Sequence, residues 1–379
     1  MSVLRPETEA ELAEILSSGG PYRICGGGTE AVIGDDAAGL SVAGLLVAGI
    51  AGIRLYEPGA LTLVAAAGTP VAEIEAALAA EGQMLPFEPM DYRRLLGTTG
   101  APTIGGVAAA NRSGPRRIHS GACRDSMIGL RFVDGAGTII RNGGRVMKNV
   151  TGYDLVKLLA GSYGTLGVVS EVAFKVLPRP EATGVCLIEG LSDHQAVAAM
   201  AVALTSPFDV SGAAHLPVGI DGAPVTMIRV EGFGESVAYR CDRLRALLGR
   251  FGDVAVETDA ARTAAGWAHV RDVAAFEGCA GDIWCISVKP SDGPDLAAAL
   301  RAVADVQITY DWGGGRIWVC APTGTDLRPS LAGFAGSARL LRGAPALRPG
   351  PASPAIAAIS DGLRARFDPH ARLNPGTRP

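Results

Sequence analysis

The sequence lacks clustered metal-ligating side chains. Its seven cysteines are scattered, no two of them form a Cys-x-x-Cys pair, and its five histidines are dispersed. Structural zinc sites and iron–sulfur clusters need closely spaced ligands, so we expect no metal. An odd number of scattered cysteines also argues against a disulfide framework. The pattern predicts a reduced protein of the cytoplasm.

The chain also lacks excess positive charge and long apolar runs. A net charge of −4 argues against a nucleic-acid-binding surface. The longest uncharged run, 37–53, is only just of spanning length and is interrupted by glycines, so two short strands explain it better than a transmembrane segment. Met1 leads straight into acidic, helical sequence, which does not look like a secretory signal.

Glycine is abundant, with 51 residues, and its clusters need a reason because glycine costs conformational entropy on folding. A short predicted strand, 21–25, leads into Gly26, Gly27, Gly28 and Thr29. Free backbone N–H groups in such a loop form a nest that suits phosphate. The loop also matches a dinucleotide fingerprint, but no amphipathic helix or suitably spaced acidic residue follows it. A plain glycine turn stays open as the alternative.

A second region, 103–180, combines glycines and small residues with arginines. This combination predicts a backbone that approaches a large anionic cofactor. Arg112, Arg116, Arg117 and Arg124 could add compensating charge, with surface ion pairing as the alternative role for each.

Composition changes after Pro180, where strand-like and helical runs alternate. We predict an α+β protein in which residues 1–180 bind the cofactor. Residues 181–350 would form an α+β cap, an antiparallel sheet with helices on one face, and residues 351–379 a helix and tail that return to the first domain.

Three ordered motifs resemble the PCMH-type FAD-binding domain of the vanillyl-alcohol oxidase family: 24–29, 104–114 with 161–169, and the terminal Phe367-Asp368-Pro369 with Leu373-Asn374-Pro375-Gly376. Within that family the chain is most similar to the E subunits of bacterial glycolate oxidase, through 113–117, 144–154, 176–180 and 310–314.

The resemblance implies two subdomains that hold non-covalent FAD, because the first loop has no histidine to tether it. It implies a cradle for the pyrophosphate at Cys25, Gly26, Gly27, Gly28 and Thr29. The remaining implied FAD contacts are Thr103, Gly105, Gly106, Asn111, Ser113, Gly114, Gly164, Val168 and Asn374.

The chain departs from the catalytic relatives in its cap. In those relatives, a His-x-Gly-x-Gly-Asn-x-His stretch of the cap supplies metal ligands and a base. The corresponding stretch of this chain is Asp311–Trp318, which contains no histidine. Arg271 is a weak candidate for binding a substrate carboxylate, with His269 as base. Residues two apart on a helix face different sides, so an Arg271–Asp272 ion pair is the plainer interpretation.

Three hypotheses remain open. The favoured one is an FAD-binding subunit of a glycolate oxidase complex, which converts glycolate to glyoxylate with a catalytic flavin subunit and an iron–sulfur subunit. Such a complex would be cytoplasmic or peripheral at the inner face of the membrane. The alternatives are a self-sufficient FAD-dependent D-2-hydroxy-acid dehydrogenase and a structural subunit with a non-functional flavin site.

Overall fold

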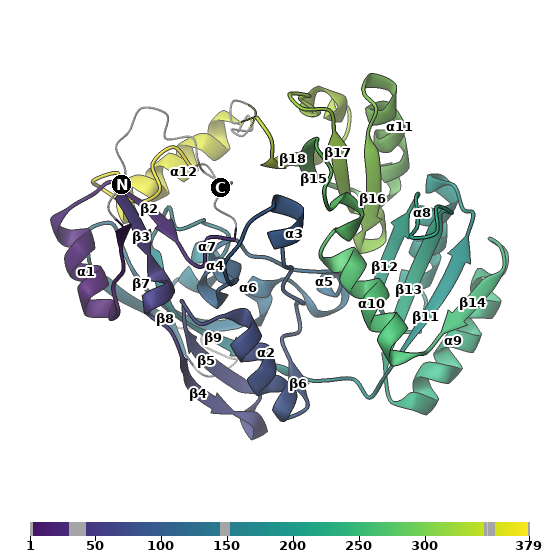
Figure 1. Cartoon of the computed structure of the whole chain (residues 1–379), viewed down its shortest axis with the longest axis horizontal. Helices are drawn as coiled ribbons and strands as arrows, with labels where there is room; N and C mark the ends of the chain where they lie inside the picture. The colour runs from purple at the N-terminus through teal and green to yellow at the C-terminus, as the bar shows by residue number, and fades with distance from the viewer. Residues whose placement is uncertain (1–2, 30–42, 145–151, 345–346, 348–352, 378–379) are drawn as a thin grey trace.

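The computed structural model describes residues 3–29, 43–144, 152–344, 347 and 353–377 (Figure 1). Ala31, the third position of the dinucleotide fingerprint Gly26-x-Gly28-x-x-Ala31, lies outside these residues. So does Thr151, which the pattern Thr151-x-x-Asp154 predicts as the cap of a helix.

Two sheets and a short strand pair make up the N-terminal part, residues 3–178. A parallel sheet has the order β1-β3-β2, formed by β1 (Val3–Leu4), β2 (Tyr22–Cys25) and β3 (Ala43–Leu46). An antiparallel sheet has the order β4-β5-β9-β7-β8, formed by β4 (Ile53–Glu57), β5 (Thr62–Ala66), β7 (Met127–Val133), β8 (Ile139–Gly143) and β9 (Val168–Lys175). The short β6 (Gln83–Met84) pairs with β10 (Leu177–Pro178).

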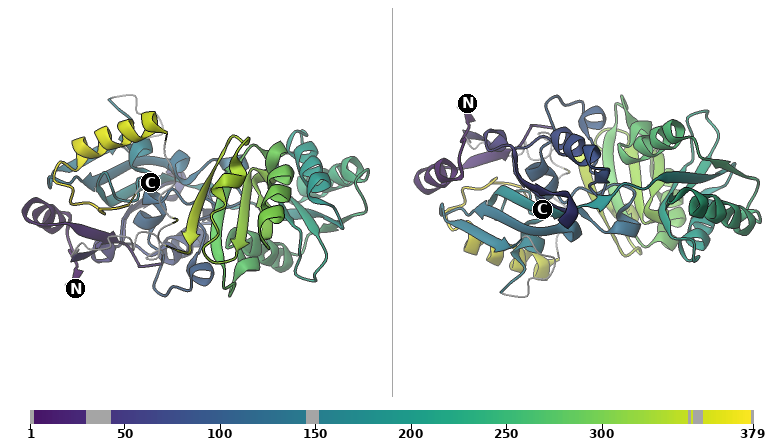
Figure 2. Two further views of the ribbon diagram at one scale, coloured as in Figure 1. Left: turned by 90° about the horizontal axis from the view of Figure 1, so that it is seen from above. Right: turned by 90° about the horizontal axis from the view of Figure 1, so that it is seen from below.

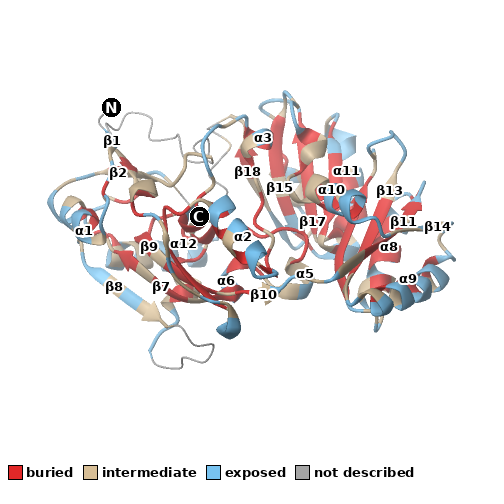
Figure 3. Cartoon of the chain, turned by 60° about the horizontal axis from the view of Figure 1, so that its bottom comes forward, coloured by how far each residue is buried: buried red, intermediate tan, exposed pale blue. Residues whose placement is uncertain are grey.

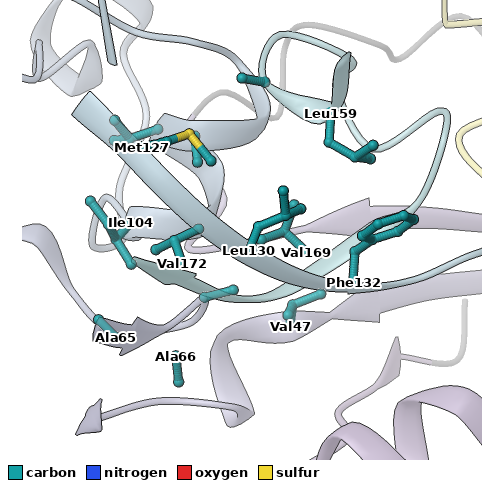
Figure 4. Packing of buried hydrophobic residues seen from close by; sticks show 14 of the residues in the cluster. Val47, Ala65, Ala66, Ile104, Met127, Leu130, Phe132, Leu159, Val169 and Val172 are labelled. Atoms are coloured by element: carbon teal, nitrogen blue, oxygen red, sulfur yellow. The ribbon is translucent and has the colours of Figure 1, made fainter. Parts of the chain in front are cut away.

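One hydrophobic core joins these sheets. Every residue of β5 is buried, which shows that both faces of this central strand are covered. Leu130, Phe132, Val169 and Val172 from β7 and β9 pack beside Ile104 in the same cluster (Figure 4). This core fixes the sheets on either side of the segment that begins at Thr103.

The helices of this part are mostly short. They are α1 (Glu9–Ser18), α2 (Val71–Ala80), α3 (Arg93–Leu96), α4 (Ile104–Ala109), α5 (Arg117–Ser120), α6 (Cys123–Ser126) and α7 (Leu155–Leu159). The side chain of Thr8 caps α1 by accepting a hydrogen bond from the amide of Glu11, as its position predicts. The predicted cap of α7 was placed too early, because Asp154 itself occupies the N-cap and accepts from Lys157.

An eight-stranded antiparallel sheet, called the cap sheet below, dominates residues 182–342. Its order is β14-β11-β13-β12-β16-β17-β15-β18. The strands are β11 (Ala182–Glu189), β12 (Val210–Leu216), β13 (Val225–Gly232), β14 (Val254–Glu257), β15 (Asp282–Val288), β16 (Gln307–Asp311), β17 (Arg316–Ala321) and β18 (Gly336–Arg342). The sequence did not reveal β12 and β18.

Helices cover both faces of the cap sheet, so the prediction that they lie on one face is wrong. One face packs against α8 (Asp193–Leu204), α9 (Gly234–Leu248) and α11 (Gly293–Val303) through residues such as Cys186. The adjacent Val185 points to the other face, where it clusters with Trp267 and Val270 of α10 (Ala260–Arg271). Side chains alternate between the two faces along a strand, so each face of the sheet has an apolar layer to cover. Figure 3 shows that the central strands of the cap sheet are mostly buried.

The last helix and the tail return to the N-terminal part (Figure 2). After α12 (Pro354–Phe367), the amide of Tyr22 in β2 donates to the carbonyl of Arg372 at 2.7 Å, and Leu373 forms a β-bridge with Tyr22. The fold is the expected α+β type. The boundaries at residues 180 and 350 stay a prediction about independent domains.

The cysteines differ from the expectation in one place. Cys279 and Cys320 are paired as a disulfide, and the other five cysteines form no disulfide. The pairing joins the turn after α10 to β17, two segments that the fold brings together from 41 residues apart. The expectation of a fully reduced chain is wrong for this pair.

Candidate cofactor-binding cavity

A large open cavity lies in the N-terminal part. It has about 1180 Å³ of empty space, which includes solvent at its mouth. Its walls come from the end of β2, the start of α4, the turn before β9 and the C-terminal tail. The cavity therefore joins segments from both ends of the chain.

Most of the predicted FAD-contacting residues line this cavity. They are Cys25, Gly26, Gly27, Gly28, Thr29, Thr103, Gly105, Gly106, Gly164, Val168 and Asn374. Met90, Tyr92 and Tyr163 also line it and were missed. Tyr163 stands between two glycines in the sequence, which could have indicated it, whereas Met90 and Tyr92 carry no such signal.

The loop after β2 presents unbonded backbone donors to the cavity. Among the described residues, the amides of Gly27, Gly28 and Thr29 donate no backbone hydrogen bond. Gly28 has φ +74°, and a Cβ atom there would meet nothing within 4 Å. Gly27 is a glycine for a different reason, because its Cβ would lie 1.6 Å from the carbonyl oxygen of Ala101. The loop is thus a packed nest whose amides are available to an anion.

Two consecutive glycines of α4 have opposite surroundings. A Cβ on Gly105 would lie 2.5 Å from Cβ of Ala67 and 2.8 Å from its carbonyl oxygen. A Cβ on Gly106 would meet only the Thr103 hydroxyl, at 3.3 Å. Gly105 is therefore required by packing of α4 against the end of β5, and Gly106 leaves open space on the cavity side.

Asn374 closes the cavity from the tail. Its Oδ1 accepts from the amide of Ile24 at 2.7 Å, and its Nδ2 donates to the carbonyl of Tyr163 at 2.7 Å. Its Nδ2 would also be 3.1 Å from a Cβ on Gly164. One side chain thus ties the tail to both β2 and the turn before β9.

Asn111, Ser113 and Gly114 do not line the cavity. The Asn111 side chain accepts from the amide of Arg124 at 3.0 Å. The carbonyls of Ser113 and Gly114 accept from Arg316 at 2.9 Å and from the indole of Trp312 at 3.0 Å. This segment joins the N-terminal part to the cap sheet.

The lining of the cavity is more apolar than polar and carries little charge. Arg23 is the charged residue in its described lining, and no aspartate, glutamate or histidine is present there. Arg23 favours an anionic ligand. The lining offers no carboxylate or imidazole as a general base.

The two weak catalytic candidates do not line the cavity. Arg271 forms a two-bond pair with Asp272, at 2.9 and 2.7 Å, and this hydrogen bonding raises the pKa of the Arg271 guanidinium. Burial lowers the pKa of His269. The observed ion pair is the plainer interpretation of Arg271.

The Asp311–Trp318 stretch is buried at the contact between the cap sheet and the N-terminal part. The Asp311 carboxylate accepts from the amide of Trp312 at 2.7 Å, and burial raises the pKa of Asp311 to about 7. Arg316 and Trp318 lie on β17, and no potential metal-binding group of three or more side chains occurs among the described residues.

A buried ionic network lies beside this stretch. Both guanidinium nitrogens of Arg229 donate to Glu88, at 2.8 and 2.9 Å, and Arg116 donates to Glu231 at 2.6 Å. Glu88 and Arg116 come from the N-terminal part, and their partners come from the cap sheet. These charges are matched across the contact.

None of the described helices is long and apolar enough to cross a membrane.

A family model and the similar proteins indicate the same family for this chain. A family model described as an FAD binding domain matches residues 2–143. The glycolate oxidase subunit GlcE of Escherichia coli (strain K12) is 34% identical over 328 residues, covering 86% of this chain and 84% of that protein. The glycolate oxidase subunit GlcD of Bacillus subtilis (strain 168) is 38% identical over 125 residues, covering 33% of this chain and 23% of that protein.

Solved structures agree on the fold. A 4-ethylphenol oxidase from Gulosibacter chungangensis has a TM-score of 0.73 at 12% identity and covers 99% of this chain and 88% of its own. An alkyldihydroxyacetonephosphate synthase has a TM-score of 0.72 at 14% identity, covering 99% and 77%. From the sequence match over most of both chains, this protein belongs to the family of FAD-binding oxidoreductase subunits that includes the glycolate oxidase subunit GlcE.

Proposed function

We propose that this chain is the FAD-binding subunit of a glycolate oxidase complex, and that it binds FAD in the cavity described above. The observation that carries the proposal is the 34% identity to GlcE over 84% of that protein, together with a cavity built from the predicted glycine motifs. The complex would oxidise glycolate to glyoxylate.

The residues present fit FAD. The unbonded amides of Gly27, Gly28 and Thr29 would hold the pyrophosphate, with Arg23 as a nearby positive charge. Hydrogen bonds to charged oxygens contribute about 1.5–3 kcal/mol each, so a few such bonds stabilise a pyrophosphate well. The open side of Gly106 would leave room for the rest of the cofactor. When bound, FAD supplies a two-electron acceptor.

The absence of a base in the described lining favours a subunit over a self-sufficient dehydrogenase. Oxidation of a 2-hydroxy acid requires removal of the hydroxyl proton, and histidine or a carboxylate usually does this. The lining has neither, and Arg271 is bonded to Asp272 outside it. In this proposal, a sister flavin subunit of the GlcD type performs the oxidation.

An iron–sulfur subunit would then pass the electrons on. This chain offers no described cluster of cysteines for such a centre, so the complex needs a third component to supply it. The assembly would work in the cytoplasm or at the inner face of the membrane.

The test compares the purified chain alone with the chain co-expressed with a GlcD-type and an iron–sulfur subunit. We expect a flavin-containing chain that does not oxidise glycolate alone and an active complex that loses activity without it. Turnover of glycolate or D-lactate by the chain alone with an artificial acceptor would support the self-sufficient enzyme. A flavin-free chain in an active complex would support a structural subunit.

A further inference from the structure

Two arginines share one tryptophan ring at the contact between the N-terminal part and the cap sheet. The guanidinium carbon of Arg316 lies 4.1 Å from the ring centroid of Trp312, and that of Arg117 lies 4.4 Å from it. Arg117 begins α5 and Arg316 begins β17. The fold therefore gathers two positive charges from distant parts of the chain onto one indole.

Neither arginine forms an ion pair with an acidic side chain among the described residues. Arg316 donates to neutral acceptors, the carbonyl of Ser113 at 2.9 Å, the sulfur of Cys285 at 3.3 Å and the sulfur of Met90 at 3.6 Å. For Arg117, no side-chain hydrogen bond or ion pair occurs within the described ranges. Its neighbour Arg116, by contrast, is paired with Glu231.

Burial makes this arrangement costly. Arg316 is only 6% exposed, and buried charges are normally paired because desolvation is unfavourable. Desolvation, followed by repulsion from Arg316, lowers the pKa of the Arg117 guanidinium. Asp311, opposite Arg316 in the sheet, attracts its charge, and burial raises the pKa of this carboxyl to about 7. An anion between the arginines would relieve the repulsion.

The pair is close to the cofactor cavity, and its Arg117 side is partly exposed. Met90 lines the cavity and contacts Arg316, and Tyr92, also in the lining, packs edge-on against Trp318 at 6.0 Å. Arg117 and Trp312 are both partly exposed. Arg117 and Trp312 are thus the side of the pair that a small ligand would reach from the surface.

We propose that Arg117 and Arg316 form a carboxylate-binding site for a small 2-hydroxy or 2-oxo acid, an inference that rests on the function proposed above. Guanidinium groups match carboxylate geometry with paired N–H donors. The carboxylate would be shared by the two arginines next to Trp312, and the site would hold the substrate or product of the complex close to the cofactor.

The test is calorimetric titration of the purified full chain with glyoxylate, followed also by tryptophan fluorescence. Arg117→Met removes one charge from a partly exposed position, and Arg316→Met removes the buried one. Arg243→Met is the matched control, because Arg243 also stacks on an aromatic ring, Tyr239, at 5.1 Å, but lies on α9.

We expect glyoxylate to bind the wild type and to bind Arg117→Met about tenfold or more weakly, from the loss of charge-assisted hydrogen bonds. The control should bind as the wild type does. Unchanged binding by folded Arg117→Met would overturn the site, as would an absence of binding by the wild type. Equal binding of inorganic phosphate would overturn the assignment to carboxylates.

Flavin content, measured in the same samples, separates this inference from the proposed function. A yellow wild type that ignores glyoxylate contradicts the carboxylate site alone. A colourless wild type that binds glyoxylate through Arg117 contradicts the FAD proposal and leaves the anion site intact.

Discussion

Replacing the two α4 glycines separately should separate folding from cofactor binding. In Gly105→Val the new side chain would collide with Ala67, whose Cβ and carbonyl oxygen lie 2.5 and 2.8 Å from the new Cβ. Overpacking of this kind costs about 1–3 kcal/mol of folding free energy. In Gly106→Val the new Cβ meets only the Thr103 hydroxyl, at 3.3 Å, and the rest of the side chain occupies cavity space.

Gly106→Val should therefore keep most of its stability and lose FAD. Glycine is already unfavourable inside a helix by about 0.5–1 kcal/mol relative to alanine, which offsets part of any local strain. Chemical denaturation of the flavin-free proteins measures the folding free energy, and flavin released by acid measures occupancy. Gly106→Ala serves as a smaller step in the same direction.

The two variants should thus differ in which property changes first, the stability of the fold or the binding of flavin. Gly105→Val should be destabilised, with flavin loss following from misfolding, and Gly106→Val should be folded and flavin-poor. A Gly106→Val protein that retains flavin at the wild-type ratio would refute the placement of the cofactor. Equal destabilisation of both variants would refute the reading of the two glycine environments.

Three further changes test the structure around the cavity. Asn374→Ala removes the two 2.7 Å hydrogen bonds of the tail and should cost about 1–3 kcal/mol of unfolding free energy, with lower flavin retention, measured by denaturation and flavin release. Glu88→Gln replaces the carboxylate that pairs with the buried Arg229 by a neutral amide. It should lower the free energy of unfolding, measured by denaturant titration, by about 3–5 kcal/mol. The pKa of Asp311 is about 7 in the folded state, above its value in the unfolded chain, so the folded state binds more protons between pH 4 and 7. The contribution of Asp311 to the free energy of unfolding therefore falls as the pH rises from 4 to 7. Asp311→Asn still accepts a hydrogen bond from the amide of Trp312. Its free energy of unfolding should therefore exceed that of the wild type by about 2–4 kcal/mol at pH 8 and by little at pH 4, as measured by urea denaturation at both pH values.

Local chemistry made much of the fold readable. The Thr69-Pro70 pair predicts a helix over 71–80, and α2 has this range, with Pro70 at the N-cap rather than at the first helical position. The glycines after β2 lie at the cavity. The loss of metal-ligating histidines in 311–318 was visible in the sequence alone. These features depend on a few neighbouring residues, so they survive without knowledge of the tertiary structure.

The remaining features depend on contacts between distant segments. Gly105 is required because of Ala67, almost forty positions earlier. The strand β12 has little periodicity because all of its residues are buried inside the cap sheet, whereas β18 is a partly exposed strand at the edge of that sheet. Arg117 and Arg316 both contact the ring of Trp312 because the N-terminal part meets the cap sheet there. No spacing rule along the chain reveals such encounters.

The most direct measurement of the central claim is the flavin content of the purified chain. Acid-released flavin should be FAD, at about one per chain, with none remaining attached to the precipitated protein. The reason is that the described lining of the cavity offers a nest of amides and no histidine for a covalent link. Recovery of the folded chain without FAD, even after incubation with an excess of it, would contradict the account.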